Sequence, residues 1–75
     1  MNVVWVNTKC VMVDESIKEM IAVAGNKGCL AVQWINGVLV TVAGNSNPDR
    51  IYRAYLRAMR EGEGNIGPYP KDFEF

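Results

Sequence analysis

The sequence predicts a small α+β domain with the element order β-α-β-β-α, a three-stranded and mainly antiparallel sheet, and two helices on one sheet face. Three observations predict this fold. An Asn-Gly pair at residues 36–37 separates two β-branched runs, as in a tight hairpin. Apolar residues recur at helical spacing over residues 16–24, and Pro48 and Gly62 bracket a second helical segment.

Composition narrows the class of protein. The chain has 75 residues, of which 49% are hydrophobic and 21% charged, and this is typical of one globular domain. Eight basic and eight acidic residues cancel, which argues against strong nonspecific binding to nucleic acid or to anionic membranes. Met1 leads directly into an apolar run with no basic segment, and no run approaches the ~18 apolar residues of a membrane span. We therefore expect a cytoplasmic protein that does not bind membranes.

The N-terminal third predicts one strand and one helix. The β-branched and aromatic residues 2–6 form the first strand, and residues 9–13 either extend it past a bulge or form a separate strand. Ser16 and Glu19 have the spacing of a capping box, so the first helix is expected to begin there. Gly25 is the expected end of that helix.

The sequence also predicts which residues of the hairpin lie opposite each other. A two-residue loop between the runs 29–35 and 38–43 pairs residues equidistant from the turn, which places Ile35 opposite Val38, Trp34 opposite Leu39, Gln33 opposite Val40, Val32 opposite Thr41, Ala31 opposite Val42 and Leu30 opposite Ala43. Apart from Gln33 and Thr41, both faces of this hairpin are apolar.

The second helix has clear ends. Asn47 is the expected cap, Pro48 occupies the first turn, and the helix should run through about Glu61 and stop at Gly62. We accordingly divide the chain into a compact domain, residues 1–61, and a C-terminal tail, residues 62–75, which is rich in glycine, proline and aromatic residues.

The run 38–43 is the most continuously apolar strand and is placed at the centre of the sheet. The first strand then pairs with its other edge, which gives the order 1-3-2. A β-α-β crossover that places the first strand beside the second, order 1-2-3, remains open. In both arrangements one apolar sheet face lies away from the helices, and the tail, a second copy of the chain or another partner must cover it. We favour a second copy, and therefore a homodimer.

Helix two carries an arginine stripe that is the principal candidate for partner binding. Its members recur at offsets of 0, 3, 7 and 10 residues and share an arc of roughly 80°; they are Arg50, Arg53, Arg57 and Arg60. Such a stripe is either a solvated helix face or a recognition site for carboxylates or phosphates. The chain's own candidates for neutralising it are Glu63, Asp72 and Glu74. The apolar residues expected behind it are Ile51, Tyr52, Tyr55, Leu56, Ala58 and Met59.

Trp5 and Trp34 lie on predicted strands. Packing in the core is the default interpretation, and an exposed aromatic platform is the alternative. We include Trp34 among the candidate partner-binding residues.

The residues needed for catalysis are missing from the sequence. Histidine is absent, and Ser16 and Ser46 have capping or turn roles. Cys10 and Cys29 are expected to be free thiols, since two cysteines without histidine do not make a zinc site. We expect a protein that is not an enzyme and that uses no cofactor or metal.

Residues 16–60 resemble the second half of a type I K-homology domain, a fold that binds single-stranded nucleic acid. The resemblance rests on residues 16–20, the hairpin, residues 42–44 and the helix that holds Ile51, Ala54 and Tyr55. It implies a 1-3-2 sheet order and nucleic-acid binding. The family's GxxG loop precedes the segment that 16–20 matches, where this chain has residues 10–13, and the only GxxG here, residues 25–28, reads as a helix cap.

These observations predict a small interaction module, homodimeric and without enzymatic activity, that binds another macromolecule. A protein partner is favoured, as for an inhibitor of the phage or plasmid type. The alternative is a K-homology-like binder of single-stranded nucleic acid that uses the arginine stripe, although the zero net charge argues against it.

Overall fold

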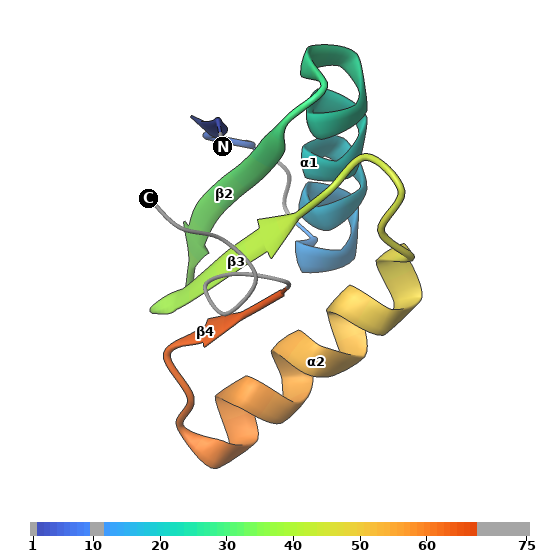
Figure 1. Ribbon diagram of the computed structural model, residues 1–75. Helices are drawn as coiled ribbons and strands as arrows, with labels where there is room; N and C mark the ends of the chain where they lie inside the picture. The colour runs from blue at the N-terminus through green and yellow to red at the C-terminus, as the bar shows by residue number, and fades with distance from the viewer. Residues whose placement is uncertain (1, 10–11, 68–75) are drawn as a thin grey trace.

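The computed structural model describes residues 2–9 and 12–67. These residues form a small α+β fold, so the predicted class is confirmed (Figure 1). The elements in chain order are β1 (Val3–Trp5), α1 (Val13–Lys27), β2 (Leu30–Ile35), β3 (Val38–Val42), α2 (Pro48–Glu61) and β4 (Asn65–Ile66).

The sheet has four strands in the order β1-β2-β3-β4. The pairs β1–β2 and β3–β4 are parallel, and only β2–β3 is antiparallel. The predicted mainly antiparallel sheet with the order 1-3-2 is therefore wrong, and the crossover alternative that places the first strand beside the second is the arrangement found. β3 does lie inside the sheet, but β4 occupies the edge that we had assigned to β1.

β4 is an element that the sequence analysis did not predict. Its residues belong to the segment assigned to the tail, yet they pair with β3: the Leu39 amide donates to the Gly64 carbonyl at 2.9 Å, and Ile66 lies opposite Val40. Ile66 is buried in the core, and it is a single apolar residue among glycines and polar residues, which is too weak a pattern to predict a strand. The remainder of the predicted tail, residues 68–75, lies outside the described residues.

The hairpin follows the predicted register. Five of the six expected pairs are present, from Ala31–Val42 at the open end to Ile35–Val38 at the turn. Asn36 and Gly37 both have positive φ, 50° and 83°, as the predicted turn requires.

Helix α1 begins earlier than predicted. It starts at Val13 after an extended Met12 that makes no side-chain cap, so the capping box at Ser16 is wrong. Ser16 instead lies buried inside the first turn, where its amide donates to the Met12 carbonyl at 3.1 Å. The apolar stripe explains the earlier start, because Val13 stands four residues before Ile17 and packs against the core. A strand over residues 9–13 was also considered, but Val13 belongs to α1. Residues 10–11 lie outside the described part of the chain.

Helix α1 also ends later than predicted. It passes through Gly25 and stops at Lys27, followed by Gly28 in the left-handed conformation with φ 64°. Gly25 lies against the loop after β3, where a Cβ atom added to Gly44 would come within 2.7 Å of the Gly25 Cα. The close contact therefore requires a glycine at position 44, while the glycine at position 28 ends the helix.

One sheet face and both helices enclose the core. Alternate strand residues, Val4, Ala31, Val40, Val42 and Ile66 among them, pack against apolar side chains of the helices, which include Met20, Ala24, Tyr55 and Ala58. The opposite face carries the other alternate set, which we call the outer sheet face: Val3, Trp5, Leu30, Val32, Trp34, Leu39 and Thr41.

Candidate interaction surfaces

Helix α2 is built as the sequence predicts. The Asn47 side chain accepts hydrogen bonds from the amides of Asp49 and Arg50 at 2.9 and 3.3 Å, and Pro48 fills the first helical position. At the other end Gly62 adopts φ 74° and caps the helix. Both ends are thus satisfied locally, so the helix presents its outer side in one orientation.

A polar contact also ties α2 to the hairpin. Tyr55 is buried, and its hydroxyl accepts a hydrogen bond from Asn36 Nδ2 at 2.8 Å. The ring of Tyr52 stacks on that of Tyr55 with centroids 6.5 Å apart. With Ala58, these residues mark the side of the helix that faces the core.

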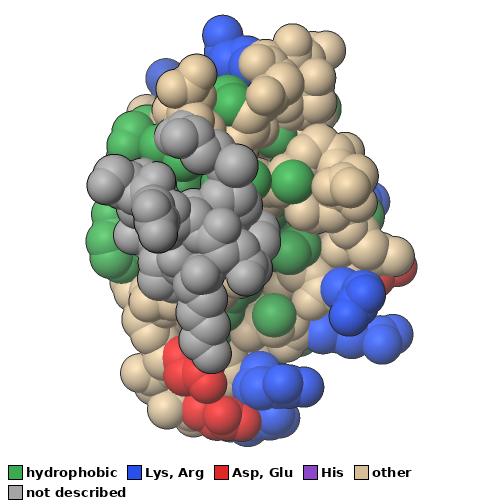
Figure 2. Space-filling model, in the orientation of Figure 1, with side chains coloured by type: hydrophobic (Ala, Val, Ile, Leu, Met, Phe, Trp, Pro, Cys, Tyr) green, Lys and Arg blue, Asp and Glu red, His purple; other side chains and the backbone are tan. Residues whose placement is uncertain are grey.

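The four arginines of the stripe are all exposed on the outer side of α2, and we call them the arginine face (Arg50, Arg53, Arg57 and Arg60). Figure 2 shows basic side chains gathered over this helix in the lower part of the view. Arg50, Arg53 and Arg57 line a shallow hollow together with Ala54. The structure therefore brings these three guanidinium groups around one depression, and Arg60 continues the face toward the C-terminal end of the helix.

The carboxylates within the described residues leave the arginine face unpaired. Asp49 and Glu61 each stand four residues from an arginine, Arg53 and Arg57, the spacing at which helical ion pairs form. Within residues 2–9 and 12–67, however, no ion pair at or below 4.0 Å is present. Glu63, one of the expected neutralising residues, is exposed. The other two, Asp72 and Glu74, lie outside the described residues.

Two large apolar side chains of α2 are also exposed, and we call them the apolar flank: Leu56, 47% exposed, and Met59, 48% exposed. We had expected both behind the stripe, but Leu56 lies next to it. Leu56 follows Arg53 by three residues and precedes Arg60 by four, so the three share one part of the helix surface. The helical spacing alone was enough to place Leu56 there.

Trp34 is exposed to 58% and Trp5 to 62%, so the expectation that both pack in the core is wrong. Trp5 lies opposite Val32, and Trp34 is two residues farther along β2, so both project from the outer sheet face. Helix α2 packs on the other face. Trp34 and the arginine face therefore belong to different surfaces.

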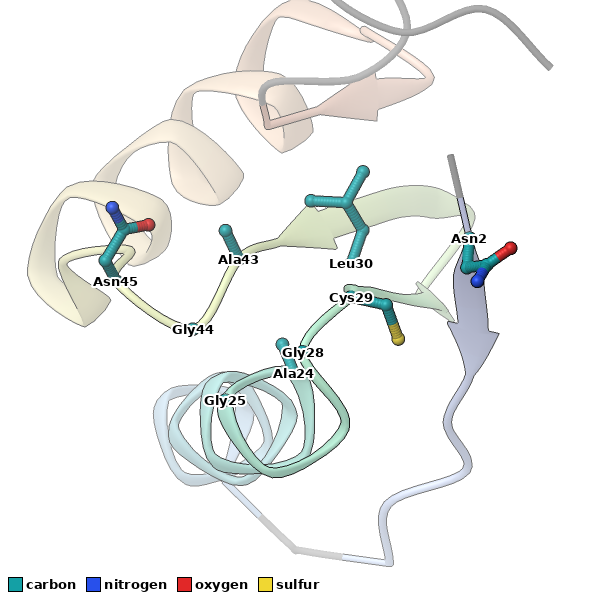
Figure 3. A pocket seen from close by; sticks show the side chains of 9 residues that line it. All are labelled: Asn2, Ala24, Gly25, Gly28, Cys29, Leu30, Ala43, Gly44 and Asn45. Atoms are coloured by element: carbon teal, nitrogen blue, oxygen red, sulfur yellow. The ribbon is translucent and has the colours of Figure 1, made fainter.

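A hollow of about 480 Å³ lies at the C-terminal end of α1 (Figure 3). The polar side chains that line it are Asn2, Asn45 and Cys29, and none of its lining residues is charged. Cys29 has a free thiol, while Cys10 lies outside the described residues. An uncharged lining with one thiol offers neither the acid–base pair nor the activated nucleophile that enzymatic sites use.

Two further findings concern the described residues only. No three His, Cys, Asp or Glu side chains among them lie close enough together to hold a metal ion. None of the helices formed by these residues is long and apolar enough to cross a bilayer.

The arrangement of the strands departs from the one that the K-homology resemblance implies, because β1 lies beside β2 and not beside β3. The GxxG at residues 25–28 forms the last turn and the cap of α1. A comparison of the chain with known protein-family models, with curated proteins and with solved structures finds no match.

Proposed function

We propose that the protein is a small interaction module without enzymatic activity, and that it binds an acidic segment of a partner protein through the arginine face of α2. The observation that carries the proposal is the alignment of four exposed arginines that no carboxylate of the described residues pairs with. Over the ten steps from Arg50 to Arg60 the helix rises by about 15 Å, so the face is long enough to contact several carboxylates. Arginine binds such groups through two parallel hydrogen bonds.

The apolar flank supports a protein partner. Leu56 and Met59 expose about half of their surface on the same helix as the arginines, and arginine and methionine are both enriched in protein interfaces. A nucleic-acid surface gains more from additional cations, whereas this chain has no net charge. Nucleic-acid binding is therefore the alternative that the following experiment distinguishes.

The test uses the double variant R53E/R57E in the full chain. Each hydrogen bond to a charged group contributes about 1.5–3 kcal/mol when it is formed in an interface, so loss at two positions is expected to weaken binding about 100-fold or more. The fold should persist, since both residues are exposed. Each reversal places a like charge four residues from Asp49 or Glu61, at a cost of about 0.2–0.5 kcal/mol.

A matched control separates the arginine face from net charge. The variant K18E/K27E reverses two exposed lysines of α1 and changes the charge of the chain by the same amount. Binding is measured by fluorescence anisotropy with a labelled poly-glutamate peptide and with a labelled oligothymidylate of equal charge, over a range of salt concentrations. We expect the peptide to bind more tightly, R53E/R57E to abolish its binding, and K18E/K27E to retain it.

Three results would contradict the proposal. Equal losses in the two double variants would show that only net charge matters. Unchanged binding in R53E/R57E would make the arginine face a solvated helix surface. Tighter binding of the oligothymidylate, with affinity falling steeply as salt rises, would assign the face to nucleic acid.

A further inference from the structure

The shallow hollow on the arginine face has the geometry with which one helix receives a side chain of another. Its lining residues stand at positions i, i+3, i+4 and i+7 of α2; they are Arg50, Arg53, Ala54 and Arg57. Four neighbours of this kind on a helix surface form the hole that accepts a knob from a facing helix in a coiled coil. The hollow measures about 290 Å³ and is open.

The chemistry of the hollow selects the knob. Ala54 is partly buried against the core and contributes only a methyl group, so it forms the floor. The three arginines are exposed and form the rim. Within residues 2–9 and 12–67 no carboxylate pairs with them at or below 4.0 Å. Because guanidinium groups bind carboxylates through two parallel hydrogen bonds, the knob that matches this hole is an aspartate or a glutamate.

The spacing of the arginine face distinguishes a helical partner from an extended one. At a rise of 1.5 Å per residue, the four arginines lie at heights of about 0, 4.5, 10.5 and 15 Å along α2. A helix with acidic residues at the same offsets matches these heights one to one, and the steps of three, four and three residues read the same in both directions. An extended segment places the side chains of one face about 6.6–6.8 Å apart, so only three fit over the same length and they fall out of step.

The next four residues at hole spacing add an apolar contact. They are Arg53, Leu56, Arg57 and Arg60, and the Leu56 side chain among them is 47% exposed. A facing helix that carries an apolar residue beside its acidic ones would cover Leu56. The arginine face therefore matches an amphipathic acidic helix better than a run of acidic residues alone.

We infer that the partner presents an acidic α-helix to α2, with carboxylates at offsets of 0, 3, 7 and 10 residues and one of them in the hollow over Ala54. This inference rests on the function proposed above and specifies the form of the partner. Helix α2 of a second copy is not that helix, because it would place arginine opposite arginine, and like charges across an interface repel.

The experiment uses the unmodified full chain and two fluorescent peptides of identical composition, each locked as a helix by a hydrocarbon cross-link. The aligned peptide carries four glutamates at offsets of 0, 3, 7 and 10 residues, and the scattered peptide carries the same four around the helix. Fluorescence anisotropy should show the aligned peptide binding at least about tenfold more tightly, because the scattered one loses at least one charge-assisted hydrogen bond. Poly-glutamate, which has no locked helix, should also bind more weakly than the aligned peptide.

The outcomes separate this inference from the proposed function. Equal affinities of the aligned and scattered peptides overturn the inference. The proposed function still stands in that case, provided that poly-glutamate binds and that R53E/R57E abolishes its binding. No binding of any of the three peptides overturns both.

A pair of variants tests the hollow itself. A54L fills it without changing any charge, and leucine is a good helix former. Binding of the aligned peptide should weaken about tenfold, the loss of one charge-assisted hydrogen bond, while poly-glutamate binding stays unchanged because all four arginines remain. The control A54S keeps the small side chain and should bind the aligned peptide like the parent chain.

Undiminished binding of the aligned peptide by A54L, or an equal loss for poly-glutamate, overturns the inference. Circular dichroism shows whether each variant is folded. Should A54L unfold, the two locked peptides on the unmodified chain still decide.

Discussion

Substitution of the two glycines at the contact between α1 and the loop after β3 should change stability in opposite directions. In G44A the new Cβ would lie 2.7 Å from the Gly25 Cα and 3.0 Å from its nitrogen, both backbone atoms that cannot rotate away. The two backbones must separate by about 0.7 Å to reach the 3.4 Å of an ordinary contact. Overpacking of this kind costs about 1–3 kcal/mol. For a domain of this size, each kcal/mol lowers the melting temperature by about 4–8 °C.

In G25A, by contrast, the new Cβ meets only the Gly44 Cα at 3.8 Å, an ordinary contact. Alanine is the better helix former by about 0.8–1.0 kcal/mol, so this variant should be more stable than the parent chain. Urea unfolding followed by far-ultraviolet circular dichroism measures both free energies. G64A is the control, because a Cβ there meets nothing within 4 Å. If G44A unfolds with the free energy of G64A, or if G25A is destabilised as strongly as G44A, the close packing of the two backbones is refuted.

Two further substitutions test single contacts. The Thr41 hydroxyl is buried and has no hydrogen-bond partner among residues 2–9 and 12–67, so T41V should raise the free energy of unfolding by about 1 kcal/mol; a decrease would mean that the hydroxyl is satisfied in solution. N47A removes the acceptor for the amides of Asp49 and Arg50 and should lower the free energy of unfolding by about 0.5–2 kcal/mol, and helix content that is retained at no cost would show that the cap contributes nothing.

Local signals predicted the parts of the fold that depend on few residues. Asn36 and Gly37 determine the hairpin and its register, because this residue pair favours a two-residue turn with positive φ at both positions, which fixes the pairing of the strands on either side. Asn47 with Pro48 and Gly62 determine the two ends of α2. In each case the residues that decide the structure lie within one turn of the feature that they produce.

The predictions failed where contacts between distant parts of the chain determine the structure. Gly25 and Gly28 are equivalent as local helix ends, and the choice depends on Gly44, which packs against the first of them. The partner of β1 depends on which strand occupies the free edge of β3, and that strand contains a single apolar residue, Ile66. No local pattern reports either contact.

The same distinction between local and distant determinants applies to the candidate sites. Helical periodicity placed the arginine face on the exposed side of α2, since its residues belong to one regular element. It did not place Trp34, because strand alternation shows which residues share a face but not whether that face is covered. The exposure of Trp5 and Trp34 therefore required the structure.

The bond between Asn36 and Tyr55, together with the two capped ends of α2, has a consequence for the entropy of binding. A disordered segment with the same four arginines would have to order the eleven residues 50–60 when it binds, at about 1–2 kcal/mol each, or roughly 10–20 kcal/mol in total. Here that ordering has already taken place during folding, with the hydrophobic core as its driving force. A partner that docks on α2 immobilises only side chains, at about 0.5–1.5 kcal/mol each, so a short acidic segment can bind with useful affinity.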